Sequence, residues 1–424
     1  MNETCEYKHS SVGRIPKGWD IVAVGSLGLV VTGNTPRTNE TDNYGGSIPF
    51  VSPADLGKTV LVHITKSTLT SKGLNQTRQI PSGAVLVVCI GSTIGKAGMA
   101  SIVCATNQQI NSIICKENNP SFVYYLMKLN SEKIRSMAGT QAVPIINKTE
   151  FSSILVQRPP FAEQQKIASI LTSADEVIEK TQSQINKLKN LKKAMMQELL
   201  TKGIGHTEFK DSPVGRIPKE WDILYICDSS VDVLDGDRGN EYPKEKDFMS
   251  SGYCLFLSAK NVTKNGFKFD ECSFISEEKD GKLRKGRLVK GDIVITTRGT
   301  VGNMAYYDES IPYEAMRINS GMAVFRNDDD LISTKFLYQL LKAPVINQQI
   351  DLLTFGSAQP QLTIGVINSL CMPVPPLTEQ HKVTDILSSI DTRINEKQRK
   401  LNHTKSLKKA LMQDLLTGRV RVKV

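Results

Sequence analysis

The chain lacks the residue patterns that several classes of protein require. Its eight cysteines contain no Cys-x-x-Cys pair and its five histidines do not cluster with them, so the spacing of a zinc site is missing. No apolar run reaches the roughly 18 to 20 residues of a membrane span, and the N-terminal residues contain no signal-peptide core. Acidic residues such as Asp235 and Asp237 lie near glycine, which is typical of solvated turns. We therefore expect a cytoplasmic protein with reduced cysteines and no bound metal.

Signatures of catalysis are also missing. The segment 91–96 resembles a phosphate-binding loop, but only three residues separate its glycines, and Ala97 follows Lys96 where Ser or Thr is needed. Residues 158–161 resemble the Asn/Asp-Pro-Pro-Tyr/Phe motif of amino-methyltransferases, yet Arg158 has no acceptor for the target amine. No Phe-x-Gly-x-Gly loop for S-adenosylmethionine and no Pro-Asp dipeptide of nucleases occurs. We predict that this chain has no catalytic residue.

Positive charge is present in excess. Lysine and arginine total 53 against 43 acidic residues, which gives a formal net charge of +10. Such an excess favours a polyanionic partner such as nucleic acid, because cations that neutralise phosphates release counterions. At 424 residues the chain is long enough for about two to four domains.

The chain is an internal repeat. Val12–Ile21 returns 202 positions later as Val214–Ile223, with nine of ten residues identical. The Pro-Pro-x-x-Glu-Gln segment at 159–164 returns 216 positions later at 375–380, and Leu-Lys-Lys-Ala-x-Met-Gln-x-Leu-Leu-Thr occurs at 191–201 and at 407–417. Between these ends the similarity fades. Two copies of one fold that bind different ligands would show this contrast, and so would a duplication that simply drifted.

Each half ends in a long predicted helix. From about 163 to 200, and again from about 380 to 416, apolar residues recur at alternating steps of three and four. About 38 residues make a rod of roughly 57 Å. The residues expected in the seam or against a partner are Ile167, Ile170, Leu188, Leu191, Met195, Ile386, Ile390, Leu407 and Leu411. The two helices can pack together as an antiparallel coiled coil, pack on partner helices, or each pack only on its own domain.

The remaining segments predict an α+β protein. Short β-branched runs such as 84–90 and 292–297 are typical of strands, and 122–127 and 336–341 are typical of helices. We predict four segments: a mixed α/β domain at 1–158, the first repeated helix at 159–204, a similar mixed α/β domain at 205–374, and the second helix with a tail at 375–424. The fold is then two similar domains separated by two long helices, with a pseudo-twofold internal repeat.

The duplicated Gly-Arg-Ile-Pro-Lys-x-Trp and Pro-Pro-x-x-Glu-Gln segments, in order and with the Leu-Leu-Thr helices, resemble the specificity subunit of type I restriction-modification systems. The resemblance covers nearly the whole chain. It implies that each domain reads one part of a bipartite double-stranded DNA site, and that the helices set the spacer. It further implies two modification (methyltransferase) subunits and restriction (translocase/endonuclease) subunits as partners, with S-adenosylmethionine, ATP and Mg needed by those partners only.

Loops with donors and cations are the predicted DNA contacts, because Arg can address guanine, Gln can address adenine, and Ser, Thr or Lys can bind phosphate. The candidates are Thr35, Arg37, Lys58, Arg78, Ser92, Lys96, Gln108, Gln109, Gln141, Arg238, Lys260, Arg298, Thr300, Asn303, Arg317, Gln359 and Gln361. The glycine-bounded loops at 91–96 and 298–303 could equally be tight turns that complete a core. Trp19 and Trp221 are expected to pack in the domains rather than stack on bases.

Lysines also recur on the two helices. Lys187, Lys189, Lys192 and Lys193 are mirrored by Lys405, Lys408 and Lys409. They could face the DNA spacer or partner subunits, or form the solvated face of a coiled coil. Because the scaffold is repeated while the candidate loops diverge, the sequence predicts a non-palindromic split target. A tandem nucleic-acid-binding regulator that acts without methyltransferase partners remains the alternative.

Overall fold

The computed structural model describes residues 6–139, 143–328, 331–354 and 361–423. The chain divides into two compact units. The first unit comprises residues 1–183 and 398–424, and the second comprises residues 184–397. Within the described ranges, no helix combines the length and the apolar character that crossing a membrane would take.

The first unit is built on a five-stranded sheet. Its strand order is β4 (Gly28–Thr32), β11 (Ile110–Cys115), β8 (Val85–Val88), β9 (Ala97–Ala100) and β6 (Leu61–Val62). Every residue of β8 is buried, because alternate side chains enter two different cores. Val85 and Val87 pack in the core that contains helix α2 (Pro120–Leu129), whereas Leu86 and Val88 pack in a second core with Val51. This is why the strand reads as a continuous apolar run.

The second unit repeats this sheet. Its sheet has the strand order β16 (Val231–Asp235), β24 (Met322–Asn327), β21 (Ile293–Thr296) and β22 (Met304–Tyr306), which corresponds to the order β4, β11, β8 and β9 of the first unit. In both sheets these neighbouring strands pair antiparallel. Helix α7 (Thr334–Leu341) takes the place of α2 in the core. The predicted strands and helices of both domains, and the mixed α+β class, are confirmed.

Smaller sheets and helices complete each unit. The first unit has a three-stranded sheet in the order β10 (Ala105–Thr106), β5 (Tyr44–Val51) and β7 (Ser67–Leu69). The second unit has one in the order β20 (Phe274–Ile275), β17 (Cys254–Leu257) and β23 (Met316–Ile318). Paired strands are β1 (Tyr7–Ser10) with β2 (Gly13–Pro16), β3 (Asp20–Ala23) with β12 (Leu155–Arg158), β13 (Phe209–Ser212) with β14 (Gly215–Pro218), β15 (Asp222–Tyr225) with β25 (Cys371–Val374), and β18 (Val262–Thr263) with β19 (Gly266–Phe267). The short helices are α1 (Ser71–Asn75), α3 (Ser131–Met137), α4 (Lys148–Ser153), α6 (Glu277–Lys282), α8 (Pro344–Thr354) and α9 (Ile364–Asn368).

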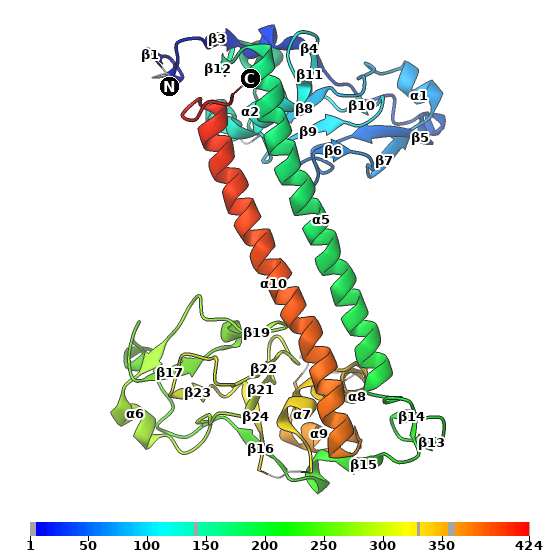
Figure 1. Cartoon of the computed structure of the whole chain (residues 1–424), viewed down its shortest axis with the longest axis vertical. Coiled ribbons are helices and arrows are strands. Elements are labelled where there is room, and N and C mark those ends of the chain that lie inside the picture. The colour runs from blue at the N-terminus through cyan, green and yellow to red at the C-terminus, as the bar shows by residue number, and fades with distance from the viewer. Residues whose placement is uncertain (1–5, 140–142, 329–330, 355–360, 424) are drawn as a thin grey trace. The chain divides into compact units, whose positions relative to one another are not determined.

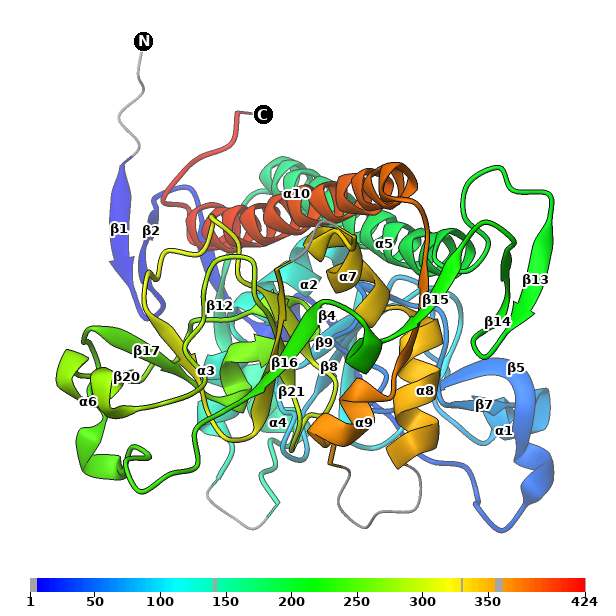
Figure 2. The ribbon, with the colours of Figure 1, turned by 90° about the horizontal axis from the view of Figure 1, so that it is seen from below.

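The two long helices, α5 (Phe161–Leu199) and α10 (Leu377–Leu416), are continuous and contribute to both units (Figure 1). In the first unit the start of α5 shares a core with the end of α10, through Ile167 and Leu416. In the second unit the end of α5 shares a core with the start of α10, through Met196 and Val383, and α7 lies beside α10 (Figures 1 and 2). Within each unit, therefore, the two helical segments run antiparallel.

Candidate nucleic-acid interface

Corresponding loops leave the first strand of each sheet at a glycine that has no room for a side chain. A Cβ on Gly33 would lie 2.2 Å from the carbonyl oxygen of Thr106, and a Cβ on Gly236 would lie 2.4 Å from that of Asn319. These close approaches press the loop after β4 against residues 107–109, and the loop after β16 against residues 319–321. Two polar surfaces therefore form at equivalent places.

Four predicted DNA contacts meet in the first unit, and we call Thr35, Arg78, Gln108 and Gln109 the first polar cluster. The hydroxyl of Thr35 donates to Oε1 of Gln108 at 2.9 Å, and the guanidinium of Arg78 donates to the carbonyl of Thr32 at 2.7 Å. Gln109 donates to the carbonyl of residue 90 at 3.4 Å, which ties the cluster to the glycine-bounded loop. Thr35, Arg78 and Gln108 are exposed, so they keep donors and acceptors available to a ligand.

Arg37 extends the first polar cluster. Its backbone N–H donates to Oε1 of Gln76 at 3.3 Å, which fixes the loop, while its side chain is 78% exposed. Its guanidinium lies 3.4 Å from Glu40. The amide of Gln76 donates a hydrogen bond to Glu40, and this is the main reason why the pKa of that carboxyl is lowered. An exposed ion pair of this kind is weak, so Arg37 can exchange its partner for a phosphate.

The second polar cluster consists of Arg238, Arg298, Ser320 and Gln361. The guanidinium of Arg238 lies 3.1 Å from Asp235 and donates to the carbonyl of Ser320 at 3.3 Å. With its amide in the hydrogen-bonding orientation, Gln361 accepts from Nε and Nη2 of Arg298 at 3.2 and 3.0 Å. Arg238, Arg298 and Gln361 are exposed. Two guanidinium groups here replace the glutamine-rich set of the first cluster.

Asp237 organises the loop that carries Arg238. Its carboxylate accepts backbone N–H groups from Gly239 and Arg284, both at 2.7 Å, and from Lys285 at 3.4 Å. These bonds, that from Gly239 foremost, hold the pKa of Asp237 below its usual value, although burial opposes them. The carboxylate is therefore used by the turn itself.

The two glycine-bounded loops, 91–96 and 298–303, differ in why they need glycine. In the first, a Cβ on Gly95 would lie 2.5 Å from the carbonyl oxygen of Ser131, so this glycine completes the core. In the second, Gly299 and Gly302 have φ of +73° and +86° with open space around them. The exposed predicted contacts on these loops are Ser92, Lys96, Arg298 and Thr300.

Other predicted contacts lie in different settings. The amide of Asn303 donates to the carbonyl of Val262 at 3.1 Å, so this half-buried side chain already serves the fold. Lys58 is exposed and follows Gly57, whose Cβ position is 3.5 Å from the stem of Lys96. Lys260 is exposed and pairs with Glu271 at 2.7 Å. Gln141 and Gln359 lie outside the described residues.

Arg317 corrects the sequence prediction. Its side chain is only 5% exposed, and its Nε is bonded to the carboxylate of Asp280. Its other nitrogens donate to the carbonyls of Asp280, Leu283 and Lys285. A guanidinium that is buried and bonded in this way has no face for a base, and it belongs to the core of the second domain.

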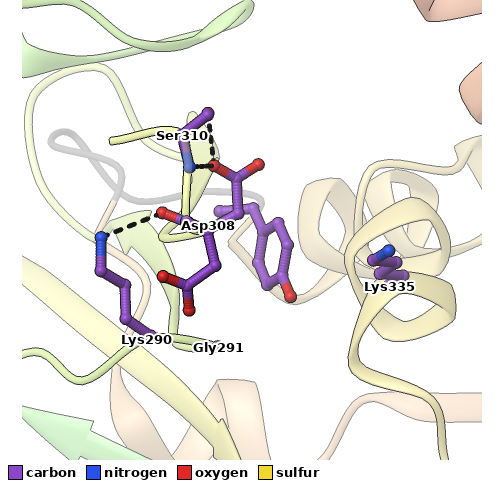
Figure 3. A pocket seen from close by; sticks show the side chains of 7 residues that line it. Lys290, Gly291, Asp308, Ser310 and Lys335 are labelled. Atoms are coloured by element: carbon purple, nitrogen blue, oxygen red, sulfur yellow. Dashed lines mark hydrogen bonds between the residues drawn. The ribbon is translucent and has the colours of Figure 1, made fainter. Parts of the chain in front are cut away.

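A cavity of about 530 Å³ in the second unit is separate from the polar cluster. Its lining is Lys290, Gly291, Tyr306, Asp308, Glu309, Ser310 and Lys335 (Figure 3). The ammonium of Lys290 donates to the carbonyls of Asp308 and Ile311 at 3.2 and 3.0 Å, and Ser310 donates to the Asp308 carboxylate. Since carboxylates and lysines share this lining, it does not present the uniformly positive field that a phosphate backbone favours.

The repeated motifs meet in an anchor that the sequence did not reveal. In the first unit the indole of Trp19 donates to the carboxylate of Glu163 at 3.2 Å, and Arg421 of the C-terminal tail binds the same carboxylate. Glu163 lies in the first turn of α5, where the helix dipole favours a carboxylate. Its side chain is also buried between a domain and the tail, and the repeated Trp and Glu were the available signal.

The second unit has the equivalent anchor, with a histidine in the place of the arginine. The indole of Trp221 donates to Glu379 at 3.0 Å, and Nε2 of His206 lies 3.0 Å from the same carboxylate. The glutamine after each Glu is also equivalent: Gln164 and Gln380 are buried and donate to the carbonyl five residues earlier. The Pro-Pro-x-x-Glu-Gln motif therefore fastens each long helix to its domain.

The predicted helix residues divide into two groups. Ile167 and Ile390 are buried, and Ile170, Leu188, Met195, Ile386 and Leu411 are half-buried. Leu191 and Leu407 are 48% and 51% exposed, so they do not belong to the packed seam. They stand 216 positions apart, at equivalent places of the repeat. That these two leucines contact partner subunits stays a prediction.

Comparisons with known proteins agree with this architecture. The family model described as type I restriction modification DNA specificity domain matches residues 16–190 and 230–403. The chain is 28% identical to the type I restriction enzyme MjaVIII specificity subunit of Methanocaldococcus jannaschii, over 97% of this chain and 95% of that protein. It is 26% identical to the MjaIX specificity subunit of the same organism, over 98% and 97%.

Solved structures share the fold. The S subunit of the type I restriction-modification system from M. genitalium superposes with a TM-score of 0.61 at 16% identity, over 98% of this chain and 97% of that one. A chain from a structure of complex assembly and conformational transition in the type I R-M system superposes with a TM-score of 0.59 at 16% identity, over 96% and 99%.

Proposed function

The chain belongs to the type I restriction-modification DNA specificity family, and on that premise we propose that it is a specificity subunit that reads a bipartite, non-palindromic DNA site. Each unit reads one half-site through its polar cluster. The observation that carries this proposal is the pairing of an equivalent scaffold, pinned at Gly33 and Gly236, with unlike polar side chains.

The two clusters suit different bases. Gln108 in the first unit can address adenine, whereas Arg238 and Arg298 in the second can address guanine. The exposed Arg37, Lys58, Ser92, Lys96, Lys260 and Thr300 serve as phosphate contacts. A net charge of +10 supports such a surface.

Partners supply the chemistry. Two modification (methyltransferase) subunits dock on the repeated helices, and restriction subunits join them to cut DNA. The exposed Leu191 and Leu407 support this arrangement, because equivalent apolar residues suit a partner that is present in two copies. This chain itself is non-catalytic and needs no cofactor, whereas S-adenosylmethionine, ATP and Mg belong to the partner subunits.

Methylation mapping followed by duplex binding tests the function. Methylated positions in host DNA, compared with those of a strain that lacks the gene, give both half-sites and their gap. The purified chain with its modification partner should then bind a duplex only when both half-sites are present at that gap. Binding that ignores one half-site or the gap would overturn the proposal. Purification without any adenine methyltransferase would favour a stand-alone regulator instead.

A further inference from the structure

One lysine of each long helix turns inward to an aspartate of the other helix. In the second unit, Nζ of Lys192 on α5 lies 2.7 and 2.6 Å from the two carboxylate oxygens of Asp391 on α10. In the first unit, Nζ of Lys408 on α10 lies 2.5 Å from both carboxylate oxygens of Asp175 on α5. The two lysines are 216 positions apart, and so are the two aspartates. We call these contacts the register pairs.

Burial distinguishes the lysines of the register pairs from the surrounding lysines, and the side chains of their partners Asp391 and Asp175 are 38% and 16% exposed. The side chains of Lys192 and Lys408 are 13% and 7% exposed, whereas the adjacent Lys193 and Lys409 are exposed. One lysine of each lysine-rich stretch is thus turned inward, while the others are exposed. Leucine and isoleucine contacts survive a slip between helices, but a slip would leave a buried ammonium without its carboxylate.

The pair of the first unit also contacts the globular part of that unit. The hydroxyl of Tyr125 on α2 donates to Asp175 at 2.8 Å, and Nζ of Lys408 lies 5.0 Å from the centre of the Tyr125 ring. In the second unit, burial raises the pKa of Tyr338 on α7 to about 12, and the charges of Lys192 and Asp391 also act on it. The first pair therefore lies where α5, α10 and α2 come together, and the core of the second unit likewise joins residues of α5, α10 and α7.

We propose that the register pairs fix α5 against α10, and that they thereby set the number of base pairs between the two half-sites. Their residues are positioning residues, which act on the DNA through the helices. The inference rests on the proposed function. A slip of one heptad would move one helix by about 10.5 Å along the other, which corresponds to about three base pairs.

The experiment uses the full chain with its modification partner and duplexes that carry the mapped half-sites. Gaps equal to the natural one, and up to about three base pairs longer or shorter, are compared. Lys192→Met and Lys408→Met are matched by Lys193→Met and Lys409→Met, which remove the same charge from exposed neighbours. We expect the ratio of the affinity for the natural gap to the affinity for the other gaps to fall about tenfold in the first two variants. In the controls this ratio should stay unchanged. A merely structural role would weaken binding to all gaps equally.

The double variant Lys192→Asp, Asp391→Lys keeps the test decisive if a single variant fails to fold. It should recover the wild-type gap preference. Folded Lys192→Met and Lys408→Met proteins that discriminate gaps as well as the controls would overturn the inference, and so would a folded double variant without the wild-type preference. A wild-type complex that binds every gap equally would instead overturn the proposed function.

Discussion

Single side chains give each unit its chemical character. Arg238 and Arg298 project from a loop and a strand end that the second domain holds in place, and both guanidinium groups are exposed with weak surface partners. A bidentate contact from arginine to guanine contributes about 1–3 kcal/mol of discrimination. A phosphate contact contributes affinity without discrimination.

Arg238→Ala and Arg298→Ala should therefore lose about 1–3 kcal/mol of preference for the correct second half-site over a substituted one. Lys260→Ala is the matched control, because it removes an exposed cation that we assign to phosphate. It should weaken binding to both duplexes alike. Fluorescence anisotropy with the modification partner present measures both effects. An unchanged preference in both arginine variants would show that Arg238 and Arg298 do not read bases of the second half-site.

Asp237 links the loop of the second cluster to pH. Since the folded state lowers its pKa, the carboxylate contributes stability that is complete above its unfolded pKa near 3.9 and is lost as pH falls through the folded value. Asp237→Asn should cost about 1.5–3 kcal/mol at pH 7, and the difference from wild type should shrink below pH 4. Urea unfolding across this pH range provides the measurement. A pH-independent difference would contradict the assignment.

Residue-scale positions were the hardest to foresee from the sequence. Arg317 is a residue type that often contacts DNA, but here it is buried and bonded to Asp280. Asp280 lies 37 positions earlier, and no local sequence pattern predicts that contact. Lys192 and Lys193 are neighbours with identical chemistry, yet one points inward and the other outward. Side-chain direction depends on the three-dimensional partner, and periodicity gives only an approximate seam.

The helices and strands were predictable for a physical reason. A long helix and a buried strand leave regular apolar patterns, and α5, α10, β8 and β21 have them. The anchoring of α5 was not predictable, because Trp19 lies 144 positions from Glu163. Leu191 and Leu407 fit the helical period and are nevertheless exposed, since the packed seam is narrower than the apolar stripe.

Helix length provides a prediction at this scale. Deleting residues 180–186 from α5 and the equivalent 396–402 from α10 removes one heptad from each helix and keeps both register pairs. The preferred gap should shorten by about three base pairs, because seven residues rise about 10.5 Å. Binding selection from duplexes with randomised gaps measures the change. Deletion from α5 alone is the contrasting variant and should destabilise the protein. An unchanged gap in the paired deletion would refute the ruler role of the helices.

At the scale of the whole molecule, charge controls affinity. The excess of 53 basic over 43 acidic residues implies binding that weakens steeply with salt. Lys58→Ala with Lys96→Ala should lower the slope of log K against log salt by about 0.9 for each phosphate that is no longer neutralised, equally on specific and unrelated DNA. Lys17→Ala, which removes a cation paired with Glu6, serves as the control. A slope that changes on specific DNA only would mean that these lysines read bases.

The duplicated anchor also provides each unit with one tryptophan that can serve as a fluorescence probe. The chain has only two tryptophans, and each unit holds one of them, buried and with its indole N–H bonded to a glutamate. When excitation is selective for tryptophan, replacing Trp19 by phenylalanine leaves tryptophan emission from the second unit alone, and replacing Trp221 leaves it from the first. The emission of each variant then follows one half of the chain, so that the melting of the two halves can be recorded separately without any attached dye.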